Sequence, residues 1–296
     1  MICVLLSTYN GEKYLAEQLE SIKNQDVTDW CVLARDDGSS DQTLQILEEW
    51  SKIINLKWYR GDNIKPAASF FSLIQNSPDA DYYAFCDQDD YWLQDKLSVA
   101  QKSLSSKAGP AMYFSQTQMA DASLKPIPTP ALNPRCNLQE SLTRSVVTGC
   151  TLVINKKMRD FLLMYTPTQV LMHDSWIYKL CMSLGGDVVY DPQSHILYRQ
   201  HGNNVMGLKK DQKKEWKRRW RSSVVNSERF RSKEVKSIVE NYNNYLPEEI
   251  KNYLTMIADY SNNIKHKCCL LFSASFTGVT LKETLLLKLL VLTNKF

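Results

Sequence analysis

The chain has 296 residues, 44% of them hydrophobic and 23% charged, a composition that fits a folded globular protein and excludes collagen-like, low-complexity and disordered classes. The length suits one large domain, or one domain with a smaller appendage. The formal net charge is +4. Eight basic and two acidic residues between Lys209 and Arg221 give that window +6, so the rest of the chain carries −2. Because the positive charge is concentrated in one window, we expect one docking surface, and nucleic acid is disfavoured as a partner.

The cysteines and histidines predict no zinc site, because no two of the eight cysteines are spaced as Cys-x-x-Cys and the four histidines complete no zinc pattern. Most cysteines lie in apolar runs, so we expect reduced, buried thiols in a cytoplasmic protein. The first apolar run, Ile2 to Leu6, ends at once in polar residues and predicts a strand, not a signal peptide. No run reaches the roughly 18 apolar residues that cross a bilayer. We therefore expect a protein that is at most peripheral, at the inner face of the cell membrane.

The first half of the chain alternates between short apolar segments and amphipathic ones. The apolar segments predict strands at Ile2–Ser7, Trp30–Arg35, Leu56–Tyr59 and Tyr82–Cys86. The segments between them predict helices over Glu12–Asn24, from an N-cap in Ser39-Ser40-Asp41 to Trp50, and over Pro66–Gln75. Residues 120–140 predict a proline-rich loop, Thr148–Ile154 a further strand, and the chain beyond Lys209 charged helices. This order predicts an α/β fold with a mainly parallel sheet covered by helices on both faces.

Polar residues directly follow three of the predicted strands, in the segments Ser7-Thr8-Tyr9-Asn10-Gly11, Asp36-Asp37-Gly38-Ser39 and Asp87-Gln88-Asp89-Asp90. Because such sheets bind ligands beyond the carboxyl ends of their strands, we expect these segments to meet in one site. Asp87 and Asp89 can share a divalent cation such as Mg²⁺ or Mn²⁺. The alternative is a solvated acidic turn or a helix N-cap. No P-loop and no Gly-x-Gly-x-x-Gly follows the first strand, which argues against phosphoryl transfer and dinucleotide binding.

These residues resemble the signature of family 2 glycosyltransferases with a GT-A fold, a Rossmann-like α/β architecture. The resemblance is carried by Leu6–Gly11, Arg35–Asp41 and Phe85–Trp92. Two later segments, Met172–Trp176 and Tyr198–Val205, resemble the rhamnosyltransferase-like branch of that family. The resemblance spans residues 1–207 and implies a catalytic domain there. Residues 208–296 are then expected to form a helical, basic C-terminal extension.

The resemblance implies a nucleotide-sugar site at the ends of the first strands. Ser7 and Tyr9 would line the nucleobase slot, with Tyr9 against the pyrimidine face. Asp37 would accept a hydrogen bond from the pyrimidine imide N–H, and Asp36 would support it. The remaining contacts, expected near the ribose or the sugar, are Asn63 and Ser69.

The resemblance also implies a metal site and a general base. Asp89 would bind Mn²⁺ or Mg²⁺, and Asp87 would contact the donor sugar or the metal. His201 is a candidate metal or diphosphate contact, although a satisfied loop histidine is the alternative. Asp174 would take the proton from the acceptor hydroxyl, because inversion at the anomeric carbon needs one base opposite the leaving group.

Two of these positions have a purely structural alternative. Asp174 precedes an apolar helical run and could simply cap that helix, although Trp176 beside it would also desolvate the carboxylate and raise its basicity. Gly149, ahead of the strand predicted over Thr148–Ile154, either lets the acceptor approach the backbone closely or serves as a turn glycine.

The C-terminal part predicts an amphipathic basic helix. Trp216, Trp220 and Val224 share one face at a spacing of four residues, and lysines and arginines occupy the other sides. Such a helix can lie on an anionic membrane surface. The alternatives are packing of the tryptophan stripe on the catalytic domain and contact with another protein. The leucine-rich run over residues 285–292 also lacks an obvious partner.

The sequence thus predicts an inverting, metal-dependent glycosyltransferase that uses a nucleoside-diphosphate sugar, either a dTDP-sugar or a UDP-sugar. We expect it to add a sugar to a bacterial surface polysaccharide or to its lipid-linked precursor. L-rhamnose is the first candidate for that sugar. The nearest alternative is the same reaction with UDP-galactose, UDP-glucose or UDP-N-acetylglucosamine. A non-catalytic nucleotide-sugar-binding partner of another transferase is a second alternative, but a pure binder needs neither Asp89 nor Asp174.

Overall fold

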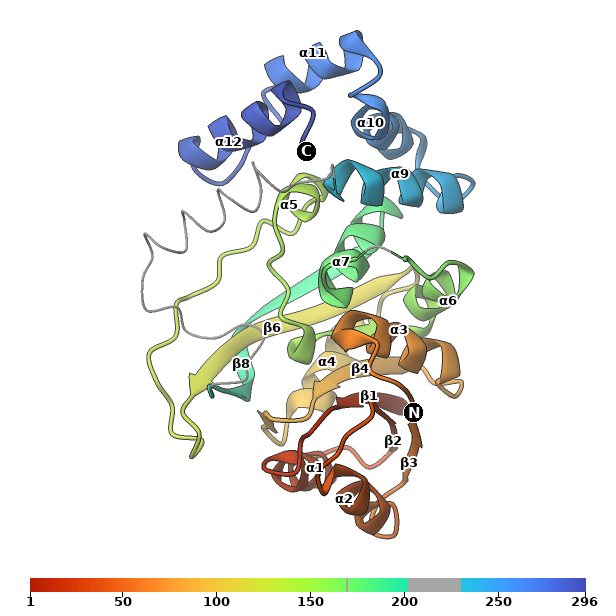
Figure 1. Cartoon of the computed structure of the whole chain (residues 1–296), viewed down its shortest axis with the longest axis vertical. Coiled ribbons are helices and arrows are strands. Elements are labelled where there is room, and N and C mark those ends of the chain that lie inside the picture. The colour runs from red at the N-terminus through yellow and green to blue at the C-terminus, as the bar shows by residue number, and fades with distance from the viewer. Residues whose placement is uncertain (169, 202–229) are drawn as a thin grey trace. The chain divides into compact units, whose positions relative to one another are not determined.

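The computed structural model describes residues 1–168, 170–201 and 230–296 (Figure 1). They form two compact units, of which the first holds Met1–Pro134, Val146–Cys181 and the described residues from Gly186 to His201. The second holds Arg135–Ser145, Met182–Gly185 and the described residues from Phe230 to Phe296. The domain boundary predicted after residue 207 and the helix predicted around Trp216 lie outside the described residues.

The described part of the first unit contains an eight-stranded sheet in the order β3-β2-β1-β4-β7-β6-β8-β5 (Figure 1). The strands are β1 (Ile2–Thr8), β2 (Trp30–Asp36), β3 (Leu56–Arg60), β4 (Tyr82–Asp87), β5 (Tyr91–Trp92), β6 (Ala111–Ala120), β7 (Val153–Asn155) and β8 (Asp187–Arg199). Strands β1 to β4 pair in parallel, and so do β6 and β8. Only β7 and β5 pair antiparallel with their neighbours. The predicted α/β fold with a mainly parallel sheet is therefore confirmed.

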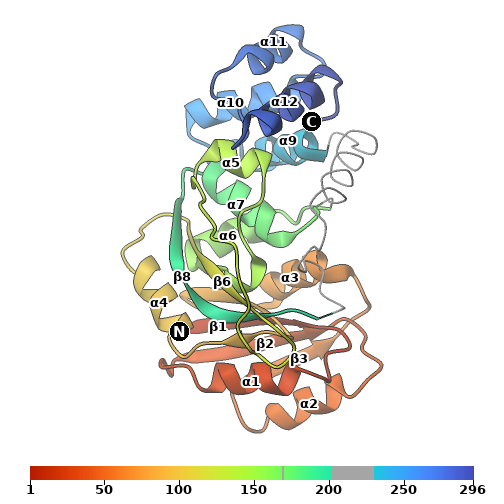
Figure 2. The ribbon, with the colours of Figure 1, turned by 90° about the vertical axis from the view of Figure 1, so that its left-hand side faces the viewer.

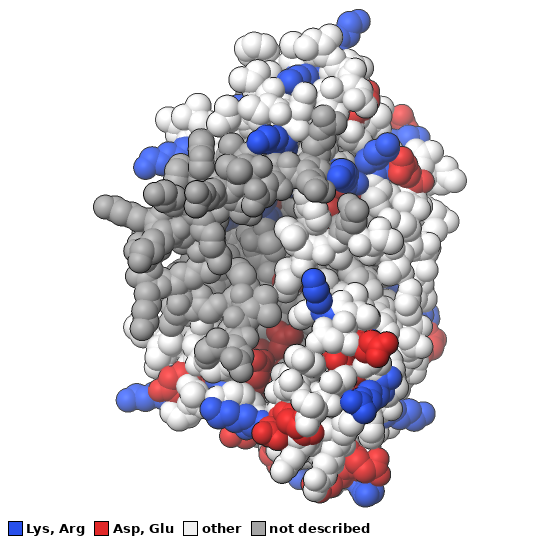
Figure 3. Space-filling view, viewed as in Figure 1, with Lys and Arg blue, Asp and Glu red and all other residues white. Residues whose placement is uncertain are grey.

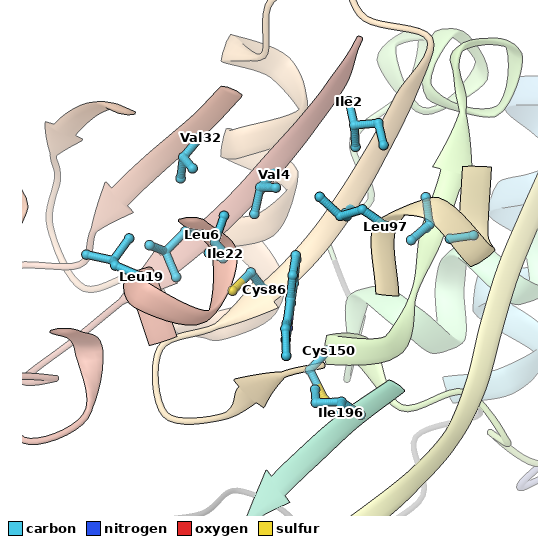
Figure 4. Close-up of a cluster of buried hydrophobic side chains, with 14 of the residues drawn as sticks. Ile2, Val4, Leu6, Leu19, Ile22, Val32, Cys86, Leu97, Cys150 and Ile196 are labelled. Atoms are coloured by element: carbon cyan, nitrogen blue, oxygen red, sulfur yellow. The ribbon is translucent and has the colours of Figure 1, made fainter. Parts of the chain in front are cut away.

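Helices cover both faces of this sheet, as Figure 2 shows for α1 and α2 on one side and α3, α6 and α7 on the other. These helices are α1 (Leu15–Lys23), α2 (Thr43–Trp50), α3 (Lys65–Asn76), α6 (Lys156–Met164) and α7 (His173–Ser183), and α4 (Lys96–Leu104) completes the set. Alternate residues of β1, such as Val4 and Leu6, pack in a cluster with α1 and α4 (Figure 4). On the other face, Phe85 of β4 lies 5.6 Å from Phe70 of α3, measured between ring centroids.

The predicted elements of residues 1–87 are confirmed, with each strand ending one residue later than expected and the first helix beginning at Leu15 instead of Glu12. Two further details were wrong. Helix α2 begins at Thr43, because the carboxylate of Asp41 accepts the Thr43 backbone N–H at 3.0 Å and Ser39 is engaged elsewhere. The strand predicted over Thr148–Ile154 begins as a 3-10 turn, Gly149–Thr151, because Leu152 N–H bonds the Gly149 carbonyl at 3.0 Å.

The second unit is helical in its described residues, as the sequence predicts. Its helices are α5 (Leu138–Thr143), α9 (Phe230–Tyr242), α10 (Glu248–Asp259), α11 (Ile264–Phe272) and α12 (Leu281–Leu292). Helix α5 begins inside the predicted 120–140 loop, because the Asn137 side chain accepts the Glu140 N–H at 2.9 Å and caps it. The buried Phe296 at the chain end donates its N–H to the Tyr260 hydroxyl at 3.0 Å, which ties the last residues to α10.

Candidate active site

The ends of β1, β2 and β4 lie side by side, because these strands pair in register. Ser7 pairs with Asp87 of β4, and Thr8 pairs with Asp36 of β2. The three polar segments that follow the strands are thereby brought to one edge of the sheet, as the sequence predicts. Gln88 then links two of them, since its side chain accepts the Tyr9 N–H at 2.8 Å and donates to the Tyr9 carbonyl at 2.9 Å. The Tyr9 ring is left exposed above this clamp.

Asp36 shapes the loop after β2 and does not reach the solvent. Its carboxylate is fully buried and accepts the backbone N–H groups of Gly38 at 3.0 Å and Ser39 at 2.9 Å, as well as the Thr8 hydroxyl at 3.2 Å. Gly38 adopts a φ of +83°, a left-handed conformation that glycine reaches without strain. The turn holds the neighbouring Asp37 at the surface of a cleft.

That cleft has a volume of about 620 Å³ and lies between the loops after β1, β2 and β3. Its walls are Tyr9, Asp37, Gly38, Arg60, Gly61, Asp62 and Asn63. The Asp37 carboxylate forms a buried ion pair with Arg35, whose guanidinium also donates to the Asp62 carbonyl at 3.1 Å. The cleft therefore offers an aromatic face on which a planar ring can stack and a carboxylate that can accept a hydrogen bond.

The other residues expected near the donor occupy two places. Asn63 lines the cleft together with Tyr9 and Asp37. Ser69 lies on α3, is fully buried, and shares a hydrogen bond of 2.8 Å with the hydroxyl of Ser7. Ser7 and Ser69 thus sit on the α3 face of the sheet, next to Asp87.

The carboxylates of Asp87, Asp89 and Asp174 are close enough for the last two to act electrostatically on the first. Burial, together with the nearby charges of Asp89 and Asp174, raises the pKa of Asp87 to about 7. The His201 Nε2 atom lies 2.7 Å from the Asp89 carboxylate, so the two expected metal ligands are brought together. Clustered carboxylates with one imidazole suit a divalent cation such as Mn²⁺, and a cation there would relieve the mutual repulsion of these charges. Asp89 and His201 would hold it.

Asp90 lies next to this group on its buried side, where Asp87, Asp90 and Cys150 are close enough together to hold a metal ion. It is fully buried, it accepts the Arg199 backbone N–H at 3.1 Å, and it lies within 4.8 Å of Asp87 and Cys150. Burial raises the pKa of Asp90 well above its usual range, as does the charge of Asp89. Cys150 belongs to the hydrophobic cluster under α1 and α4 (Figure 4), so Asp90 supports the turn from the core side.

Asp174 lies in the first turn of α7. One carboxylate oxygen accepts the Ser175 N–H at 2.5 Å, and the Gly149 N–H also donates to the side chain. Burial raises the pKa of Asp174 to about 6, which places it near the pH at which a general base works best. The cap and the base are therefore compatible roles for one residue.

His173 is a structural residue, as expected from the sequence, and its buried ring packs at the start of α7. Its ring lies between Phe70 and Phe85, with ring centroids 4.0 and 5.2 Å away. Burial lowers the pKa of His173 to about 3, so the ring beside Asp174 is neutral. A Cβ on Gly149 would lie 2.8 Å from the His173 Nε2 atom. The small size of Gly149 therefore leaves room for the His173 ring. Because that ring already fills the space, an acceptor cannot approach the backbone of Gly149 there.

Arg199 is a further residue that the sequence did not single out. It is buried and donates to the Asp89 carbonyl at 2.9 Å, the Ala122 carbonyl at 2.6 Å and the Glu17 carboxylate at 2.6 Å. Its guanidinium also lies 4.3 Å from the centre of the Tyr14 ring. Donating hydrogen bonds in three directions requires the planar guanidinium group of arginine. Arg199 therefore positions the turn formed by Asp87–Asp90.

Arg199→Lys is expected to weaken metal binding as well as stability. A lysine leaves at least one buried carbonyl without its donor, which costs about 1–3 kcal/mol, and it frees the Asp89 backbone. Titration of Mn²⁺ against activity should show a higher half-saturating concentration, and the melting temperature should fall. Arg159→Lys is the matched control, because the Arg159 side chain binds the Ser77 carbonyl at 2.9 Å, away from these carboxylates. An equal metal response in both variants would reject the positioning role.

The sequence profile of the family described as Glycosyl transferase family 2 matches residues 3–158. The chain is a family 2 glycosyltransferase. It is 29% identical to the dTDP-rhamnosyl transferase RfbG of Shigella flexneri over 228 residues, which cover 72% of this chain and 77% of that protein. It is 36% identical to the poly(ribitol-phosphate) β-N-acetylglucosaminyltransferase TarS of Staphylococcus aureus over 104 residues, only 33% of this chain and 18% of that protein.

Two solved structures share the fold of this glycosyltransferase. S. aureus TarS 1–349 in complex with UDP-GlcNAc superposes with a TM-score of 0.61 and 19% identity, over 99% of this chain and 80% of the other. The mannosyltransferase PcManGT of Pyrobaculum calidifontis, in complex with GDP-Man and Mn²⁺, superposes with a TM-score of 0.53 and 17% identity, over 100% of this chain and 80% of the other.

Proposed function

We propose that this glycosyltransferase is an inverting, Mn²⁺- or Mg²⁺-dependent enzyme that moves L-rhamnose from a dTDP- or UDP-sugar to a bacterial surface polysaccharide or its lipid-linked precursor. The contact of 2.7 Å between Asp89 and His201, together with the cleft walled by Tyr9 and Asp37, carries the proposal. The identity to RfbG supports rhamnose, and the similarity to TarS, whose name gives poly(ribitol-phosphate) as its acceptor, supports a polymeric acceptor. The domain assignment, 1–207 catalytic and 208–296 extension, and the cytoplasmic location belong to the same proposal.

The proposed chemistry assigns one task to each group. The acceptor hydroxyl loses its proton to Asp174, and its oxygen forms a bond to the anomeric carbon as the bond from that carbon to the diphosphate breaks. A divalent cation at Asp89 and His201 would stabilise the negative charge on the departing diphosphate. Asp174 stays basic because burial raises its pKa to about 6, and the adjacent His173, whose pKa burial lowers to about 3, adds no positive charge that would lower it. Inversion follows because base and leaving group act on opposite faces of the sugar.

The same reaction with UDP-N-acetylglucosamine, UDP-glucose or UDP-galactose is the second candidate. The backbone similarity to TarS bound to UDP-GlcNAc, which extends over 99% of this chain, favours it. Both candidates need a pyrimidine nucleotide, so the base is the first property to test.

Uridine and thymidine diphosphates are expected to bind at least about tenfold more tightly than cytidine diphosphate. Asp37 accepts a hydrogen bond from the imide N–H of the first two bases, cytosine lacks this donor, and one charge-assisted hydrogen bond contributes about 1.5–3 kcal/mol. Calorimetry with Mn²⁺ present measures the three affinities. Asp37→Asn should narrow the difference, whereas Asp62→Asn, at the same cleft, should leave it unchanged. Equal affinities in the wild type would reject this donor class.

A further inference from the structure

Helix α12 is apolar on two opposite sides. Leu287, Leu290 and Val291 are buried against the rest of the second unit. Leu281, Leu285 and Leu292 are 76%, 62% and 57% exposed. At 3.6 residues per turn these three point within about 40° of one another, away from the buried side. A helix normally packs its apolar side against other apolar groups, whereas in the described part of the chain the side of α12 that carries Leu281, Leu285 and Leu292 stays exposed.

Helix α11 carries a second exposed apolar stripe. Ile264 and Phe272 are 72% and 87% exposed, and Cys268 between them is exposed too. Their spacing of four residues puts them on one side of the helix. The two helices are joined, because the Lys288 Nζ atom donates to the Leu270 carbonyl at 2.6 Å and to the Ser273 carbonyl at 2.8 Å.

The charge around these stripes is almost entirely positive. Residues 264–296 contain five lysines and one acidic residue, Glu283, so this segment carries +4. Glu283 is engaged in the capping box of α12, where it accepts the Val279 N–H at 2.8 Å. The surface over α11 and α12, at the top of Figure 3, is mostly white with separate blue groups and little red. Among the described residues, no helix has the length and apolar character of a membrane span.

We propose that the α11–α12 face, defined as Ile264, Phe272, Leu281, Leu285 and Leu292 with the exposed Lys265 and Lys282, docks on the surface of an anionic lipid bilayer. The apolar side chains would enter the boundary between headgroups and acyl chains, and these two lysines would meet the anionic headgroups. A second copy of the chain is a poorer occupant, since two faces of the same positive charge repel each other. Membrane docking rests on the proposed function in one respect only, namely that it would bring the enzyme to a lipid-linked acceptor.

The test is sedimentation of the full chain with lipid vesicles. We expect binding to vesicles of equimolar phosphatidylcholine and phosphatidylglycerol, weaker binding to phosphatidylcholine alone, and release by salt. Phe272→Ser/Leu281→Ser/Leu285→Ser should bind at least about tenfold more weakly, because three apolar side chains no longer enter the lipid. Lys265→Glu/Lys282→Glu should lose only the preference for the anionic vesicles.

Ile53→Ser is the matched control, because Ile53 is a similarly exposed apolar residue of the first unit, and it should bind as the wild type does. A wild type that stays in the supernatant, or a triple variant that binds unchanged, would overturn the proposal. So would a wild-type dimer in sedimentation velocity that the triple variant loses, since that assigns the face to a second copy. Hydrolysis of a soluble nucleotide sugar should be equal in the wild type and the triple variant, so failure of the proposed function would be seen separately.

Discussion

Asp174→Asn is expected to lower kcat by about 10²–10⁴-fold, the usual cost of losing a general base. The asparagine keeps an oxygen that can accept the N–H groups of Ser175 and Gly149, so the start of α7 should hold. It cannot take a proton from the acceptor. Nucleotide affinity, measured by calorimetry, should stay near that of the wild type. A variant that keeps more than about a tenth of its turnover would contradict the role of Asp174.

The same substitution should stabilise the protein at neutral pH. Burial raises the pKa of Asp174 from 3.8 to about 6, so the folded state binds this proton more tightly than the unfolded state does. Stability therefore falls as the pH rises between these values, by up to about 3 kcal/mol. Asp174→Asn removes this penalty, so its melting temperature should exceed that of the wild type above pH 6. The difference should vanish below about pH 3, where the wild-type carboxyl is protonated in both the folded and the unfolded state.

The pH dependence of the wild-type rate follows from the same group. A base with a pKa of about 6 is ionised above that pH, so kcat/KM should rise with pH through this value and then level off. A helix cap alone predicts neither this profile nor the loss of turnover in Asp174→Asn, because asparagine is itself a good cap.

The strand ends could be predicted from sequence because the rule behind them is local. An apolar run followed by Asp87-Gln88-Asp89-Asp90 marks the end of a parallel strand, and parallel strands bring such ends to one edge. The register of β1 with β2 and β4 then places Ser7, Asp36 and Asp87 together.

The residues that hold the site could not be predicted, because their partners are distant in sequence. Arg199 contacts the Asp89 carbonyl across 110 positions, and Gln88 clamps Tyr9 across 79. Strand β8 was not predicted either. Pro192 interrupts the strand pattern of its sequence, at the point where the register between β8 and β6 becomes irregular. The contacts of His173 could not be predicted from its position before Asp174, because they depend on how Phe70 and Phe85 pack around its ring.

Asp89→Asn is expected to abolish sugar transfer. Chelation of the metal with EDTA is expected to abolish the activity of the wild type. Without a divalent cation, the carboxylates around Asp89 repel the diphosphate, and nothing offsets the charge that grows on it. Nucleotide affinity should lose its dependence on Mn²⁺ in this variant. His201→Ala should keep part of the activity and need more Mn²⁺, since it removes one ligand and leaves Asp89. Asp62→Asn serves as the control, because Asp62 lines the cleft but lies outside the group of carboxylates.

The release of nucleoside diphosphate from a set of nucleotide sugars shows whether this chain is a metal-dependent transferase that uses a pyrimidine nucleotide. The wild type is incubated with each dTDP-, UDP- and GDP-sugar, first with Mn²⁺ and then after EDTA. We expect release from at least one dTDP- or UDP-sugar with Mn²⁺, and a fall to background with EDTA or in Asp89→Asn. Release from no pyrimidine nucleotide sugar, or release that persists unchanged in EDTA, would contradict this expectation.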